Sequence, residues 1–123
     1  MAHLGFLLTR SISASAGSRS FRLLSRAALN KGHKVSVIFA DDGIYQCVFN
    51  KRYKGDNDDM LSFLSDLKRR GAYLVADYAS LNGRGLNLDN IPTDPEDNKV
   101  LIKIVTVEEL VKIIGLVDQV ICL

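Results

Sequence analysis

Carboxylates that directly follow two apolar runs are the first candidates for chemistry. The runs are KVSVIFA at 34–40 and AYLVA at 72–76, and aspartate follows both. Short continuous apolar runs predict strands that are buried on both faces. Because ligands of an open parallel sheet bind outside the carboxyl ends of its strands, the residues after these two runs could line one pocket. The candidate pocket residues are Asp41, Asp42, Gly43, Asp77, Ser80, Arg84 and Gly85.

Three of these side chains, Asp41, Asp42 and Asp77, allow two interpretations. Hard divalent cations take carboxylate oxygens as ligands, so a converging trio could serve a metal-dependent or small-molecule enzyme. Alternatively, Asp41 or Asp42 caps one helix N-terminus and Asp77 caps the next, because Asp is a preferred N-cap residue. We favour capping, and we expect neither a metal nor a cofactor here. The run Gly83–Gly85 could likewise approach an anion, or it could simply end a helix.

The two cysteines offer the thiols of the chain. Cys47 closely follows the Asp-Asp-Gly turn, so it lies on the pocket side of the expected sheet. A helix N-terminus could lower its pKa and activate it, whereas its apolar neighbours predict a buried, small hydrophobic residue. Cys122 lies in the expected last strand, where we expect burial unless the chain end frays. The spacing fits neither a disulfide framework nor a zinc site, which favours a reducing cytoplasm.

Other polar residues give weaker signals. A loop at 9–18 precedes the first expected helix, and its hydroxyls could bind an anion or serve only for capping and chain reversal. The hydroxyls belong to Ser11, Ser13, Ser15 and Ser18. His3 and His33 begin strands, at the end of the sheet opposite to the candidate pocket, so we expect no catalytic role for them.

Strands and helices alternate along the chain, and we expect one domain over residues 1–123. Strands are expected at 4–8, 34–40, 72–76, 100–105 and 119–123. The first helix is expected to end at Asn30. Further helices are expected at 44–50, 58–70 and 78–82, and the last from Thr106 to Gly115. The first helix should bury Phe21, Leu24 and Ala28, and the last should bury Leu110, Val111, Ile113 and Ile114. This order predicts a three-layer α/β/α fold of flavodoxin-like layout, with a mainly parallel five-stranded sheet covered on both sides.

Composition excludes several classes of protein. Hydrophobic residues make up 47% and charged residues 24% of the chain, as in ordinary globular proteins. No apolar run approaches the ~20 residues that span a bilayer, so we expect no membrane association. The net charge of +2 is unevenly distributed: residues 1–40 carry six basic residues and no acidic ones. This segment could be a transit peptide or a nucleic-acid-binding face. We favour a solvated helix face, because Arg19, Arg22 and Arg26 share one side of a helix.

Five segments together carry a resemblance to a known family. They are LGFLLT at 4–9, AALNKGH at 27–33, KVSVIFADDGIY at 34–45, IKIVTVEELVKII at 102–114 and VDQVICL at 117–123. In order and spacing they resemble the DsrE/DsrF-like family, which includes the TusD-type sulfur-relay proteins. The resemblance covers nearly the whole chain and implies the fold described above.

The resemblance also implies where sulfur chemistry would take place. Active members carry a persulfide-forming cysteine after the third strand, sometimes with a second cysteine three residues later and then Arg-Gly. In this chain those positions are Asp77, Ser80 and Arg84-Gly85. Because a thiolate is needed to hold sulfur, sulfur transfer is not expected at Asp77. A sulfur carrier using Cys47 is the alternative.

The resemblance therefore implies a non-catalytic, partner-binding subunit of a sulfur-relay or related assembly. Family members form trimers, hexamers or hetero-oligomers, so we expect a homo-oligomer or a hetero-oligomer with related subunits. A sulfur-carrier protein is a further candidate partner, and no nucleic acid is expected.

Overall fold

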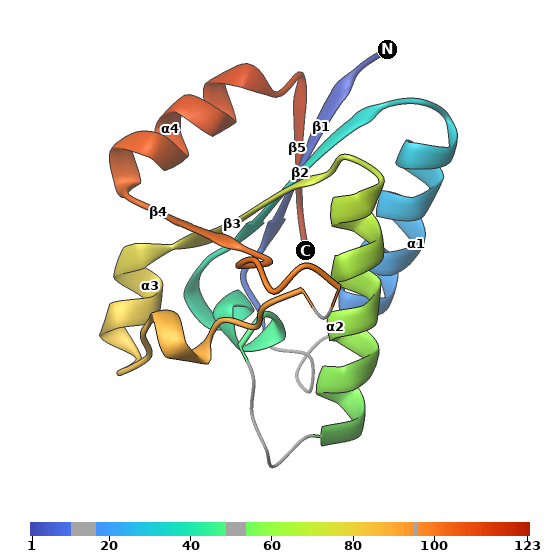
Figure 1. Ribbon diagram of the computed structural model, residues 1–123. Helices are drawn as coiled ribbons and strands as arrows, with labels where there is room; N and C mark the ends of the chain where they lie inside the picture. Colours follow the sequence, from blue (N-terminus) through green and yellow to red (C-terminus); the bar gives the residue numbers. More distant parts are fainter. Residues whose placement is uncertain (11–16, 49–53, 95) are drawn as a thin grey trace.

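The computed structural model describes residues 1–10, 17–48, 54–94 and 96–123, and the side chains of 17, 18 and 54–59 are not described. Five strands form one sheet in the order β4-β3-β2-β1-β5, and every neighbouring pair is parallel (Figure 1). The strands are β1 (His3–Leu8), β2 (Lys34–Phe39), β3 (Tyr73–Asp77), β4 (Lys103–Val105) and β5 (Gln119–Cys122). The order differs from the 2-1-3-4-5 order of flavodoxin itself, although the layers and strand direction are those expected.

Helices cover the two faces of the sheet unequally. The helical segments are α1 (Gly17–Asn30), η2 (Asp41–Gln46), α2 (Lys54–Arg69), α3 (Tyr78–Gly83), η4 (Leu88–Asn90) and α4 (Val107–Leu116). Figure 1 shows α1 and α2 side by side on one face, while α4 lies on the other. The predicted three-layer α/β/α arrangement is confirmed. None of the described helices is long and apolar enough to cross a membrane.

The main core lies between the sheet and the pair α1 and α2. Side chains from β1, β2 and β3 that point to this side are almost completely buried. Phe21 of α1 contacts Phe6 of β1 and Phe63 of α2, with ring centroids 6.0 and 5.5 Å apart and edge-to-face geometry. Such pairs contribute about 0.5–1.5 kcal/mol each beyond the apolar area they bury. Phe21 therefore joins the sheet to both helices.

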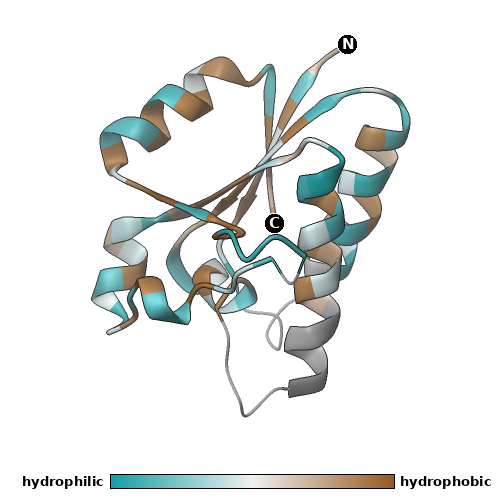
Figure 2. Ribbon diagram, viewed as in Figure 1, coloured by the Kyte–Doolittle hydropathy of each residue, from teal (hydrophilic) through white to brown (hydrophobic). Residues whose placement is uncertain are grey.

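The opposite face has a much smaller core. Ile113 of α4 packs on Ile38, Val75 and Val105, which point to this side of the sheet. The hydropathy colouring shows further hydrophobic residues along α4 (Figure 2). Val111 of this helix is 64% exposed. The expectation that Val111 is buried was therefore wrong, and so was the same expectation for Ile114, which is 39% exposed. One ten-residue helix cannot cover a five-stranded sheet, and no other described helix packs there.

Most predicted elements are confirmed, with shifted boundaries. Helix α2 begins at Lys54 and not at 58, and β4 begins at Lys103 and not at 100. The short helix after β2 begins at once, at Asp41, as a 3-10 helix. Leu24 is 44% exposed, because Ser25 takes the buried position beside Phe21 and donates a hydrogen bond to its carbonyl oxygen.

Candidate functional site

The residue that ends β3, Asp77, is hydrogen-bonded to the helix that follows it. Asp77 Oδ2 accepts hydrogen bonds from the Ser80 backbone N at 3.2 Å and from Ser80 Oγ at 2.6 Å. The first bond is the N-cap interaction of α3, which satisfies one of the free N–H groups at the start of a helix. The capping interpretation is thus supported for Asp77. It was wrong for Asp41 and Asp42, because the N-cap residue of η2 is Ala40 and no side chain caps that helix.

Ser80 connects α3 to the segment after β2. Its Oγ accepts a hydrogen bond from the Asp41 backbone N at 2.9 Å, across 39 positions of sequence. Asp41 has a φ of +49°, a left-handed conformation that aspartate tolerates better than most residues. The hydroxyl of Ser80 therefore serves both segments at once, as donor to Asp77 and acceptor from Asp41.

Arg84 makes the second connection between the same two segments. Its Nε and Nη2 atoms donate to Asp42 Oδ1 at 3.2 and 3.0 Å, and Nη1 donates to the Ser80 carbonyl oxygen at 3.1 Å. Gly85 follows with a φ of +69°, which suits the end of α3. Arg84 therefore holds η2 against α3.

Gly43 brings the same segment against β1. A Cβ atom built on Gly43 would lie far closer than 3.0 Å to the Leu8 carbonyl oxygen, so only glycine fits there. The buried Gln46 adds a second tie, since its Nε2 donates to the Arg10 carbonyl oxygen at 2.5 Å. Gln46 was not a predicted site residue, and a glutamine in an apolar run gives little sequence signal. The segments that follow β1, β2 and β3 are thus tied together at the carboxyl end of the sheet.

The three carboxylates do not converge on a cation site. Asp42 faces Arg84, and Asp77 faces Ser80. Across the described residues, no group of three or more histidine, cysteine, aspartate or glutamate side chains is placed to hold a metal ion. The metal-dependent alternative therefore finds no support in the geometry.

Two other groups of predicted residues contribute nothing to this cluster. The serine hydroxyls at 11, 13, 15 and 18 lie outside the described residues. The histidines lie at the opposite, amino-terminal end of the sheet, as expected. His3 Nε2 lies 2.7 Å from Ser36 Oγ, and His33 Nδ1 accepts a hydrogen bond from the Ala2 backbone N at 3.0 Å.

Comparison with protein families identifies the chain. The model of the DsrE/DsrF-like family matches residues 2–123. The chain belongs to this family. No curated protein matches the chain.

Solved structures agree with the family in fold. The ychN protein from E. coli matches with a TM-score of 0.68 at 15% sequence identity, over 100% of both chains. A protein of unknown function from Methanobacterium thermoautotrophicum, MTH1491, matches with a TM-score of 0.59 at 16% identity, again over 100% of both chains. At these identities the likeness shows that the fold is shared.

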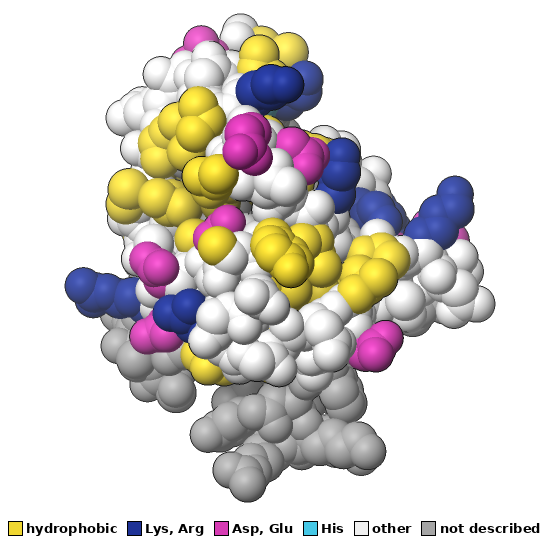
Figure 3. All heavy atoms as spheres, turned by 90° about the vertical axis from the view of Figure 1, so that its left-hand side faces the viewer, with side chains coloured by type: hydrophobic (Ala, Val, Ile, Leu, Met, Phe, Trp, Pro, Cys, Tyr) yellow, Lys and Arg dark blue, Asp and Glu magenta, His cyan; other side chains and the backbone are white. Residues whose placement is uncertain are grey.

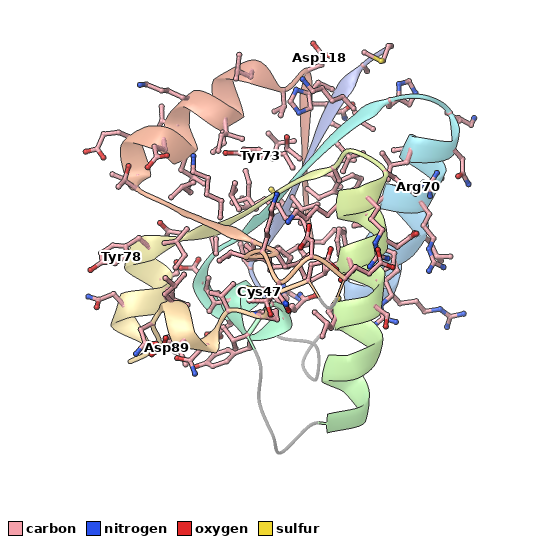
Figure 4. All side chains as sticks on the ribbon, in the orientation of Figure 1. Cys47, Arg70, Tyr73, Tyr78, Asp89 and Asp118 are labelled. Atoms are coloured by element: carbon pink, nitrogen blue, oxygen red, sulfur yellow. The ribbon has the colours of Figure 1, made fainter. Side chains whose placement is uncertain are left out.

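The two thiols of this DsrE/DsrF-like chain are in different environments. Cys47 is 3% exposed within the main core, at the end of η2 (Figure 4), and its Sγ donates to the Ile44 carbonyl oxygen at 3.2 Å. Burial raises the pKa of the Cys47 thiol far above its usual range, which keeps it protonated at neutral pH. Cys122 is exposed, contrary to expectation, because β5 is an edge strand and its neighbours Ile121 and Leu123 are the residues that pack against the main core.

Proposed function

We propose that this chain is a partner-binding subunit of a sulfur-relay or related assembly, and that it carries no sulfur at the end of β3. The observation that carries the proposal is the side chain of Asp77, hydrogen-bonded to Ser80 at the position where the family resemblance expects a persulfide cysteine. A carboxylate cannot form a persulfide, since that step needs a thiolate.

The retained Arg84-Gly85 pair is consistent with a structural role in the absence of the cysteine. Arg84 uses three of its nitrogen atoms to hold Asp42 and the Ser80 carbonyl oxygen. A residue that fixes the position of η2 against α3 is useful whether or not sulfur chemistry takes place beside it. We infer that the architecture of the family site persists here without its nucleophile.

The alternative of a relocated thiol at Cys47 is not favoured. A sulfur donor would have to reach a side chain that lies inside the main core, and the raised pKa of that thiol suppresses the reactive thiolate. Both cysteines are free thiols, which is typical of proteins in a reducing cytoplasm.

Exposed hydrophobic side chains on α4 support the partner-binding part of the proposal. Val107, Val111 and Ile114 are exposed and lie at i, i+4 and i+7, so they form one stripe, which we call the α4 patch. Figure 3 shows hydrophobic side chains gathered on the side of the molecule that carries α3 and α4. Contiguous exposed apolar surface of this kind is typical of protein–protein interfaces. We propose that the patch joins copies of this chain in a trimer or hexamer, or joins it to related subunits.

The sulfur-free part of the proposal can be tested by mass spectrometry. The purified protein is incubated with a sulfane-sulfur donor, and the intact mass is measured before and after reduction. The expected result is no reducible gain of about 32 Da, the mass of one sulfur atom, on Cys47. The Cys47→Ser and Cys122→Ser variants assign any adduct to its thiol. A stable adduct that is lost with Cys47→Ser would overturn the proposal in favour of a sulfur carrier.

The partner-binding part can be tested by native mass. We expect an oligomer for the wild-type chain, and dissociation to smaller species for Val111→Glu, because burying an unpaired carboxylate in an apolar contact is costly. Lys112→Glu is the matched control, since it places the same side chain on the same helix outside the α4 patch. A wild-type monomer with no affinity for related subunits would contradict this part.

A further inference from the structure

The outward face of α1 is strongly basic and partly apolar. Arg19, Leu23 and Arg26 follow one another at i, i+4 and i+7 and are exposed, and Arg22 lies beside them. The inward face of the same helix is buried through Phe21 and Ala28, so α1 is firmly seated on the sheet. We call the four outward residues the basic α1 face.

Two of these arginines are held in place by an aromatic ring. The guanidinium carbon of Arg26 lies 4.9 Å from the centroid of the Phe63 ring, and that of Arg22 lies 5.8 Å from it. Cation–π contacts use the flat face of a guanidinium group and leave its N–H edges available. Because Phe63 is itself buried against Phe21, the ring is a fixed platform. Arg22 and Arg26 are therefore pre-ordered donors.

The charge of this face is not neutralised by the described side chains. The ion pairs of the described residues involve Arg69, Arg84 and Lys103, and none involves an arginine of α1. Arg69, on the neighbouring helix, is by contrast occupied by Asp94 and Glu96. Arg70 extends the positive surface, because its Nη2 donates to Asn30 Oδ1 at 2.6 Å at the end of α1 (Figure 4).

We propose that the basic α1 face binds an acidic helix or segment of a partner protein, with Arg22 and Arg26 holding its carboxylates and Leu23 contacting an apolar side chain between them. The guanidinium group of arginine can donate two parallel hydrogen bonds to one carboxylate. Hydrogen bonds between charged groups are stronger than those between neutral groups. This surface lies on the opposite side of the sheet from α4 (Figure 1), so it can be occupied together with the α4 patch. This second binding surface is separate from the proposed assembly of related subunits through the α4 patch.

An acidic protein fits this face better than a nucleic acid does. Exposed Leu23 stands among the arginines, whereas single-stranded nucleic acids are held by exposed aromatic platforms, and Phe63 is buried. The pI of the chain is about 8.6 and the net charge is +2, both modest for a nucleic-acid-binding domain.

The test is binding of a fluorescein-labelled amphipathic helical peptide in which glutamates flank a leucine, followed by fluorescence anisotropy. Two further probes are the same peptide with glutamine for glutamate and a labelled single-stranded DNA. The variants are Arg22→Gln/Arg26→Gln, Leu23→Ser and, as a matched control, Lys31→Gln/Lys34→Gln. The control removes the same charge from the same acid-free segment but lies outside the basic α1 face. Circular dichroism confirms that each variant is folded.

We expect the glutamate peptide to bind and the double arginine variant to weaken binding about tenfold or more, since each bond to a charged group contributes about 1.5–3 kcal/mol. Leu23→Ser should weaken binding without a change in charge, and the lysine control should bind like the wild type. The proposal fails if the glutamate peptide does not bind, if the lysine control loses as much affinity as the arginine variant, or if the DNA binds more tightly than the peptide. None of these results depends on oligomer formation or on sulfur loading.

Discussion

Ser80 Oγ lies 2.6 Å from Asp77 Oδ2, so the residue at the end of β3 is bound to the first turn of α3. The same hydroxyl accepts a hydrogen bond from the Asp41 backbone, which makes Ser80 the link between the segments after β2 and β3. A position that the family resemblance assigns to sulfur chemistry has here become a structural junction. That junction can be tested by stability measurements that do not depend on any partner.

Replacing Asp77 should destabilise the fold through loss of the helix cap. We expect Asp77→Ala to lower the free energy of unfolding by about 1 kcal/mol, the usual cost of removing an N-cap side chain. Asp77→Asn should lower the free energy of unfolding by less, because the side-chain oxygen of asparagine can still accept a hydrogen bond from the Ser80 N–H. Urea denaturation of the three proteins measures the difference. Equal losses in both variants would show that the cap hydrogen bond is not the cause.

Gly43→Ala should be far more damaging than an alanine at a glycine with open space around it. The added Cβ would collide with the Leu8 carbonyl oxygen, and overpacking of this kind costs about 1–3 kcal/mol or more. Gly115→Ala is the matched control, since nothing lies within 4 Å of its Cβ position and α4 should gain from alanine. Thermal denaturation compares the two. A fully stable Gly43→Ala protein would contradict the close approach of η2 to β1.

The alternation of strands and helices, and the cluster at the carboxyl ends of the strands, could be predicted from sequence because both depend on local patterns. The run KVSVIFA predicts a buried strand, and the position of Asp77 directly after a strand predicts a helix N-cap. The partnership of Ser80 with Asp41 could not be predicted, since it depends on how two distant segments are placed. Local pattern also shows which side of a helix is apolar, but not whether the same chain covers it.

Because local sequence patterns do not show which surfaces the folded chain covers, the predictions of burial for Val111 and Cys122 were wrong. Val111 was expected in the core because it belongs to an apolar run, yet the apolar residues of α4 surround more of the helix than the sheet can bury. Cys122 was expected to be buried because it lies in a strand, yet strand order placed that strand at an edge. Both residues are exposed for reasons of topology, and topology follows from contacts across the whole chain.

The two cysteines should react with a thiol reagent at very different rates. Cys122 is exposed and should be labelled rapidly by an aromatic disulfide at neutral pH. Cys47 should be labelled only after unfolding, because it is buried and burial raises the pKa of its thiol. Absorbance of the released thiolate counts the reactive groups with and without denaturant. The Cys122→Ser variant should release none under native conditions, and rapid labelling of that variant would show that Cys47 is accessible.

Asp94 should make stability depend on pH. It is buried, and the pKa of its carboxyl is held below the usual value by a hydrogen bond from the Glu96 backbone N and by the charge of Arg69. A lowered pKa in the folded state means that the stabilisation is complete near neutral pH and is lost as the pH falls below about 4, through the folded-state pKa.

Asp94→Asn keeps an oxygen for the Glu96 N–H but removes the charge. The wild type should therefore be more stable than Asp94→Asn at neutral pH, and the two should converge in acid, as measured by melting temperature across a pH series. Asp97→Asn, at an exposed position, should follow the wild-type curve; a constant gap between wild type and Asp94→Asn at every pH would contradict the role of the charge.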